Sequence, residues 1–305
     1  MTDGGLIAAR FVHYVALALA FGALAYGHYG RREILPGVAR AMSRLAVFGS
    51  VGVLFGAHAV LAATVAGLGG GPESLADHEL WAVVLVETDF GRVWIARLLL
   101  ALVLLLVSVA LARRESRPLR IAGSIVAALL VASVALTGHA ASLEGNAGLL
   151  HRAADAAHIL AAMTWLGALP ALLLLLRAAS TDGAAANEAA LRLHQFHTIG
   201  LAAVLVLVAS GVVNTWFLVG SLAGLIGTPY GQVLLLKLAL FALMLVLAAR
   251  NRFGATPRLR RSLSDEVHRR SAVRLLQARV NGEIVLGVSV LGAVAMLGAM
   301  APDSV

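Results

Sequence analysis

The sequence contains no cysteine among its 305 residues. Structural disulfides, thiolate metal sites and cysteine nucleophiles are therefore excluded, and any metal ion must be held by histidine, methionine, carboxylate or backbone ligands. The sequence also lacks a Walker-type phosphate loop, so ATP-driven pumping by this chain alone is not expected. Ser142 lies near His139 and Glu144 but outside any nucleophile elbow. We therefore expect no enzymatic activity.

Charged residues are scarce, at 13% of the chain, whereas 60% is hydrophobic and the mean hydropathy is +0.89. Apolar runs of about 20 residues predict membrane-spanning helices, because the hydrocarbon core is about 30 Å thick. Eight runs meet this criterion: Leu6–Tyr29, Ala41–Gly67, Val93–Ala112, Leu119–His139, Ala154–Leu176, Ile199–Leu218, Val233–Ala249 and Val280–Met300. They do not alternate polar and apolar residues, which excludes a β-barrel. We predict an all-α, polytopic membrane protein with eight transmembrane helices.

The net charge of +8 comes from basic residues on one side of this arrangement. Nineteen of the 24 lysine and arginine residues fall in loops on that side, and the opposite loop from Glu73 to Asp89 is acidic. By the positive-inside rule, the basic side is cytoplasmic and both termini are periplasmic. The charge thus indicates topology in a lipid bilayer rather than a nucleic-acid partner. The amino terminus lacks the basic region of a cleavable signal peptide, so we expect the first span to be retained.

Two motifs occur twice, in the same order. "HYVALALAFGAL" from His13 matches "HILAAMTWLGAL" from His158, 145 residues later, and "TDFGRVWIARLL" from Thr88 matches "TPYGQVLLLKLA" from Thr228, 140 residues later. Each half then contains four helices, so the halves share one orientation in the membrane. The pattern predicts two parallel four-helix repeats, residues 1–145 and 146–305, related by a pseudo-two-fold axis along the membrane normal.

Three segments outside the spans also carry predictions. Residues 72–86 predict a short interfacial helix on the outer surface. Residues 262–279 are predicted to form either a basic amphipathic helix on the cytoplasmic surface or a solvated charged linker. The stretch "STDGAAANEAA" is expected to be a flexible loop.

Histidines from several spans are predicted to lie at one depth below the outer surface. On the fifth span, His151, Asp155 and His158 share one helical face, and imidazole with carboxylate at this spacing can bind a first-row metal ion. Alternatively, the carboxylate orients an imidazole, or Asp155 caps the helix while the histidines reach interfacial water. The candidate metal ligands are His13, His58, His139, His151, Asp155 and His158.

Further residues are candidate auxiliaries. Asn214 lies at a depth comparable to His58. Met296 and Met300 stand one turn apart, and thioethers suit Cu(I), although core packing is the better explanation of both. Arg97 and Lys237 are equivalent in the repeat, and Lys237 is the single lysine. These two bases either extend to the headgroups, pair with a carboxylate such as Asp155, or hold an anion such as a haem propionate.

The chain resembles the CopD-type copper-resistance membrane proteins over its whole length. The resemblance rests on "TGHAA" at 137–141, "AHILAAMTWLGAL" at 157–169, "SGVVNTW" at 210–216 and "TPYGQVLLLKLALFALMLVLAARNR" at 228–252. It implies a bacterial inner-membrane protein of copper homeostasis, which accepts copper from a periplasmic CopC-like carrier and passes it inward. His13, His139 and His158 are the positions carried over. The chain lacks a Met-rich or His-rich tract and a fused CopC-like domain, so capture by such motifs is not expected.

The leading hypothesis is a copper transporter in which intramembrane histidines between the halves bind copper. One alternative is a b-type haem protein in which two histidines from facing helices ligate iron. A second alternative is a scaffold for oxidase assembly that binds no metal. Direction of transport, copper valence, coupling ion and oligomeric state are left open.

Overall fold

The computed structural model describes residues 3–28, 35–138 and 143–302, and all regular structure within these ranges is helical. Eight helical segments are long and apolar enough to cross a membrane, which confirms the predicted all-α membrane fold. The long helices are α1 (Asp3–Ala25), α2 (Pro36–Leu68), α4 (Asp89–Arg113), α5 (Arg117–Ser133), α6 (Gly145–Ala179), α7 (Gly183–Leu218), α9 (Pro229–Arg250) and α11 (Glu266–Leu297).

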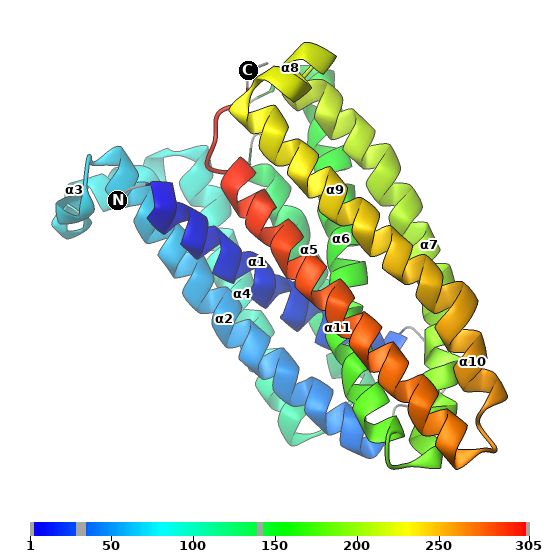
Figure 1. Cartoon of the computed structure of the whole chain (residues 1–305). Coiled ribbons are helices and arrows are strands. Elements are labelled where there is room, and N and C mark those ends of the chain that lie inside the picture. Colours follow the sequence, from blue (N-terminus) through cyan, green and yellow to red (C-terminus); the bar gives the residue numbers. More distant parts are fainter. Residues whose placement is uncertain (1–2, 29–34, 139–142, 303–305) are drawn as a thin grey trace.

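Shorter helical pieces extend or connect these helices. They are η1 (Tyr26–His28), η2 (Pro72–Ala76), α3 (His78–Ala82), η3 (Val83–Glu87), η4 (Val134–Leu136), α8 (Leu222–Gly227), η6 (Asn251–Ala255) and α10 (Thr256–Arg261). The predicted short helix at 72–86 corresponds to η2, α3 and most of η3, which protrude beside the amino terminus (Figure 1). η3 and η6 are π-helical, a geometry that is often found at functional sites.

Two of the predictions for segments outside the spans are wrong. Residues 266–279 are neither a separate surface helix nor a linker, because α11 continues without a break from Glu266 into the eighth span. Proline is absent from this stretch, and Asp265 caps its start by accepting hydrogen bonds from the amides of Val267 and His268. The loop expected after the fifth span is also mostly helix, since α7 begins at Gly183 with an alanine-rich first turn.

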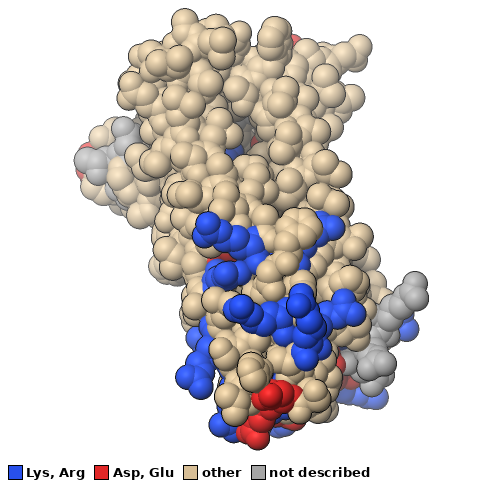
Figure 2. All heavy atoms as spheres, turned by 45° about the vertical axis from the view of Figure 1, so that its right-hand side comes forward, with Lys and Arg blue, Asp and Glu red and all other residues tan. Residues whose placement is uncertain are grey.

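The two ends of the bundle differ in charge. Both termini lie at one end, here called the terminal end (Figure 1). Lysine and arginine side chains gather at the opposite end, here called the basic end, while the surface nearer the terminal end is mostly uncharged (Figure 2). Large apolar side chains such as Phe48 and Trp216, 71% and 72% exposed, lie on the outside of the bundle. In a soluble protein this surface would aggregate, but it suits contact with lipid chains.

Helices α1 and α6 form the centre of the bundle, and each packs against the other as well as against α5 and α11. They cross at Gly22 and Gly167, where a Cβ on either residue would overlap the backbone of the other. Small residues at helix crossings in membranes allow this close backbone contact. The two glycines stand at the same place in the repeated motif, nine residues after His13 and His158.

The second repeated motif forms the same cap twice. Thr88 Oγ1 accepts a hydrogen bond from the amide of Gly91 at 2.9 Å, and Thr228 Oγ1 accepts one from Gly231 at 3.0 Å. Each hydroxyl also donates to a carbonyl of the preceding short helix. A Cβ on either glycine would overlap that preceding backbone. The threonine and glycine of this motif are therefore explained by local structure rather than by chemistry.

The two halves differ in how their second and third spans pack. In the first half α2 packs along α4, whereas α7 and α9, both fully described, do not pack along each other. They are connected at the basic end, where α10 contacts α7. The face that α7 and α9 form has a hollow in its uncharged half, with a basic and an acidic group visible inside (Figure 2).

Candidate functional site

His13 lies in the interior of the first half, only 2% exposed. Its Nδ1 donates a hydrogen bond to the carbonyl oxygen of Val53 on α2 at 3.2 Å. Donation to a carbonyl requires the proton on Nδ1, so a neutral ring carries its lone pair on Nε2. This Nε2 is buried and has no hydrogen-bond partner among the described residues. Histidines that bind metals usually donate a hydrogen bond from their other ring nitrogen to a carbonyl or carboxylate oxygen.

His158 repeats this arrangement in the second half. Its Nδ1 lies 3.0 Å from Ser210 Oγ on α7, and that hydroxyl donates its own proton to the carbonyl of Val206 at 2.5 Å. The hydroxyl therefore accepts from Nδ1, which leaves the lone pair on Nε2. Unlike His13, the His158 side chain is only partly buried. Each histidine also faces a glycine of the following span, Gly56 or Gly211.

Four polar side chains adjoin His158 and form, with it, the Asp155 cluster. Asn214 Nδ2 donates to Asp155 Oδ1 at 3.1 Å, and Asn214 Oδ1 is buried without a hydrogen-bond partner among the described residues. Lys237 on α9 interacts electrostatically with both Asp155 and His158. The cluster comprises Asp155, His158, Ser210, Asn214 and Lys237, contributed by α6, α7 and α9.

Two tyrosines flank the cluster. Tyr230, at the start of α9, and Tyr14, on α1, both interact electrostatically with Asp155. Tyr14 follows His13 directly in the chain, and its ring centroid lies 6.3 Å from that of His13. The Asp155 cluster thus adjoins the boundary between the two halves.

Arg97 and Lys237 are equivalent in sequence but have different surroundings. The Arg97 guanidinium, 2% exposed, donates to Ser133 Oγ, to the Ser133 carbonyl oxygen and to Thr137 Oγ1 at 2.6–3.0 Å. It also lies over the Trp94 ring at 4.2 Å. These contacts join α4 to the end of α5 and leave Arg97 engaged within the first half. Lys237, in contrast, interacts electrostatically with Asp155.

Two other predicted histidine ligands, His58 and His151, are not brought into this cluster. His58 lies on the exposed side of α2, where its Nδ1 donates to the carbonyl of Leu54 on the same helix at 2.8 Å. The His151 ring is 2% exposed and stacks on Phe217, with centroids 4.8 Å apart. His139 lies outside the described residues. The depth argument from sequence did not determine which way the His58 and His151 side chains point.

The methionines have apolar surroundings. Met296 is 41% exposed on α11, and Met300 packs against the small apolar group that contains Val219 and Leu297. Within the described part of the chain, no three His, Cys, Asp or Glu side chains converge to hold a metal ion.

Sequence reasoning missed three groups of this interior. Ser210 is adjacent to Gly211 in the quoted motif "SGVVNTW". A hydroxyl within a membrane span was the signal that could have identified Ser210 as a hydrogen-bond partner of a histidine. Tyr14 directly follows His13. Glu283 was the clearest omission, because it is the one charged residue in the apolar run Val280–Met300.

Comparison with known proteins identifies relatives along the whole chain. Residues 1–149 match the family model described as copper resistance protein D-like, N-terminal domain, and residues 190–297 match the model described as copper resistance protein D. No solved structure matches the chain.

Curated relatives agree with these matches. The chain is 32% identical to copper resistance protein D of Pseudomonas syringae pv. tomato over 99% of this chain and 98% of that protein. It is 33% identical to inner membrane protein YebZ of Escherichia coli K12, over 83% of this chain and 85% of that protein. A 36% identical match to copper transport protein CutJ of Bacillus subtilis covers 80% of this chain and 46% of that longer protein. The chain therefore belongs to the copper resistance protein D family of membrane proteins.

Proposed function

We propose that the protein moves copper across the bacterial inner membrane, entering from the periplasmic side at the Asp155 cluster. The observation that carries this proposal is the pair formed by an accessible imidazole and a carboxylate within a membrane span. His158 is anchored through Nδ1 and offers Nε2, and Asp155 lies one turn earlier on the same helix. Ionisable groups at such depth are costly in lipid and usually mark an ion pathway.

The separation of α7 and α9 supports access to this site. The Asp155 cluster lies on α6, α7 and α9, and the last two helices do not pack along each other. In the first half the equivalent helices are closed over His13, and Arg97 is held by α5. We infer that copper reaches His158 first and that the buried Nε2 of His13 serves a later position.

Lys237 explains how the site is maintained without copper. Its ammonium balances the Asp155 carboxylate when no other cation is present. An arriving copper ion competes with the Lys237 ammonium for Asp155 and is repelled by it. This repulsion keeps copper binding weak enough for release. A transport site needs such limited affinity, whereas a storage site does not.

We also infer that residues 1–145 and 146–305 are two structural repeats. The support is that equivalent residues have equivalent contacts: Gly22 meets Gly167, Thr88 and Thr228 form the same cap, and His13 and His158 are both anchored through Nδ1. Basic residues at one end support a cytoplasmic location for that end and periplasmic termini. A soluble periplasmic carrier of the CopC type fits delivery at the terminal end.

Copper retention by the purified protein tests the binding step. In equilibrium dialysis against a fixed copper concentration, the wild type should retain bound copper, and His158→Ala should lose most of it. His58→Ala is the matched control, because that imidazole is exposed and bonded to its own helix. Equal retention by the wild type and His158→Ala would contradict the proposed site.

A further inference from the structure

A second polar group lies inside the second half, away from the Asp155 cluster. Glu283 on α11 is 3% exposed and Asn251, the first residue of η6, is 6% exposed. Asn251 Nδ2 donates to Glu283 Oε1 at 2.6 Å, and the Trp165 indole of α6 interacts with the same carboxyl group. Three elements, α6, η6 and α11, therefore meet at one buried carboxyl group.

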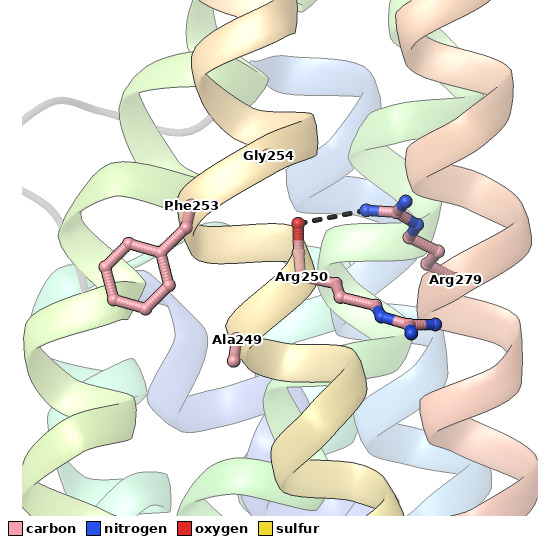
Figure 3. A pocket seen from close by; sticks show the side chains of 5 residues that line it. All are labelled: Ala249, Arg250, Phe253, Gly254 and Arg279. Atoms are coloured by element: carbon pink, nitrogen blue, oxygen red, sulfur yellow. Dashed lines mark hydrogen bonds between the residues drawn. The ribbon is translucent and has the colours of Figure 1, made fainter.

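Among the described residues, no cation is found that balances a negative charge on Glu283. Arg279 stands one turn earlier on α11, but its Nη1 donates to the carbonyl oxygen of Arg250 at 2.9 Å, as Figure 3 shows. The charged residues of α6 lie nearer its ends, at Arg152, Asp155 and Arg177. Neither these residues nor the described charged residues of α1 and α10 are among the groups that act on Glu283. An unbalanced carboxylate is strongly disfavoured within a membrane span, so the group must take up a cation or a proton.

The surroundings favour a proton over copper. Copper prefers nitrogen and sulfur ligands, and the groups on this carboxyl are an amide and an indole N–H, which has no lone pair to offer. Asn251 Oδ1 is buried without a hydrogen-bond partner among the described residues. A protonated Glu283 has one oxygen that can accept from Asn251 Nδ2 and one O–H that can donate to Asn251 Oδ1. Protonation therefore gives Asn251 Oδ1 the partner that the carboxylate form cannot provide.

The π-helical turn η6 carries Asn251 next to a hollow on the surface of the protein. Ala249, Arg250, Phe253, Gly254 and Arg279 line a surface hollow of about 520 Å³ (Figure 3). Asn251 lies between Arg250 and Phe253 in the chain, and Glu283 is one turn from Arg279. Arg279, which lines the hollow, stands one helical turn before Glu283 on α11, so water that fills the hollow would offer a short path for a proton.

We propose that Glu283 is a proton-binding group of the membrane interior, which takes up and releases one proton through the basic end in each transport cycle. Uptake forms an O–H bond on the carboxylate with a proton from water, and release reverses this step. The inference rests on the proposed copper transport for its coupling, but the proton site itself can be measured without copper.

Infrared difference spectroscopy tests the proton site directly. Wild-type protein in lipid nanodiscs, titrated between acidic and alkaline buffer, should show a protonated-carboxyl band that Glu283→Gln lacks. Glu266→Gln is the matched control, because that carboxylate is exposed on the same helix and paired with Arg270. An unchanged band in Glu283→Gln would overturn the proposal.

Transport in vesicles with an imposed pH gradient tests the coupling. Copper uptake by the wild type and by Glu266→Gln should change with the gradient, whereas Glu283→Gln should retain bound copper but lose this response. A gradient response equal to that of the wild type in Glu283→Gln would overturn the coupling. Failure of the wild type to move copper would instead contradict the proposed function and leave the infrared result to decide the proton site.

Discussion

Gly22 of α1 and Gly167 of α6 meet at the centre of the bundle so closely that neither can carry a Cβ without overlapping the other's backbone. Both stand nine residues after a histidine anchored through Nδ1. The crossing therefore sets the relative position of the two helices that carry His13 and His158. Its geometry should affect both stability and copper handling.

Replacing either central glycine should destabilise the protein. Gly22→Ala or Gly167→Ala inserts a methyl group into backbone and should lower the free energy of unfolding by about 1–3 kcal/mol. Thermal unfolding in detergent measures this effect. Gly67→Ala is the control, because a Cβ there meets nothing within 4 Å. Equal unfolding temperatures for the control and the two central variants would contradict the crossing.

Lys237 and Arg97 should behave differently despite their equivalence in sequence. Lys237→Met removes a positive charge that competes with copper at Asp155, so copper should bind about tenfold more tightly, or about 1.4 kcal/mol. Equilibrium titration with a copper-chelating indicator measures the affinity. Weaker binding in Lys237→Met would show that the lysine supports the site instead of opposing the ion.

Arg97→Met provides the comparison for that variant. It leaves Ser133 and Thr137 without their hydrogen-bond donor and should cost about 1–3 kcal/mol of stability, with little change in copper affinity. A variant with wild-type unfolding but lost copper binding would instead place Arg97 in the binding site.

Copper retention should fall as the pH is lowered, because a proton competes with the metal for His158 Nε2. The slope of retention against pH should be smaller in His158→Ala, which has already lost this ligand. His58→Ala should follow the wild type throughout. Copper analysis after equilibration across a pH series measures the three slopes, and identical slopes would remove His158 from the ligand set.

The haem alternative predicts a coloured protein. We expect the purified wild type to show no Soret band, since Arg97 is engaged by Ser133 and Thr137 rather than facing an open site. Absorbance spectroscopy with parallel metal analysis distinguishes the two cases. A stoichiometric Soret band that is lost in His158→Ala would replace copper transport with haem binding.

The number and type of the spans could be predicted because lipid imposes a length and composition that the sequence displays directly. The repeated motifs likewise indicated that His13 corresponds to His158 and that Thr88 corresponds to Thr228. The direction of a side chain was harder to predict. His13 and His58 were predicted at similar depth, yet the His13 ring is buried within the bundle and the His58 ring is exposed on its surface. Depth comes from counting residues, whereas direction depends on which helices pack together.

Interactions between distant segments were also beyond the sequence. Nothing local indicates that Asn214 bonds Asp155 or that Asn251 bonds Glu283, because each pair joins separate helices. The helix expected at 262–279 is present from Glu266, but the prediction that it is a separate surface helix was wrong for a different reason. Its amphipathic pattern was real, but the helix continues into the following span without a break.

Copper uptake into proteoliposomes tests the central claim most directly. The experiment compares the wild type, Asp155→Asn, His158→Ala and the control His58→Ala at equal protein density. If copper passes through the Asp155 cluster, the wild type and His58→Ala take up copper, and uptake is lost in both Asp155→Asn and His158→Ala. Uptake at the wild-type rate by those two variants would contradict the passage of copper through the Asp155 cluster.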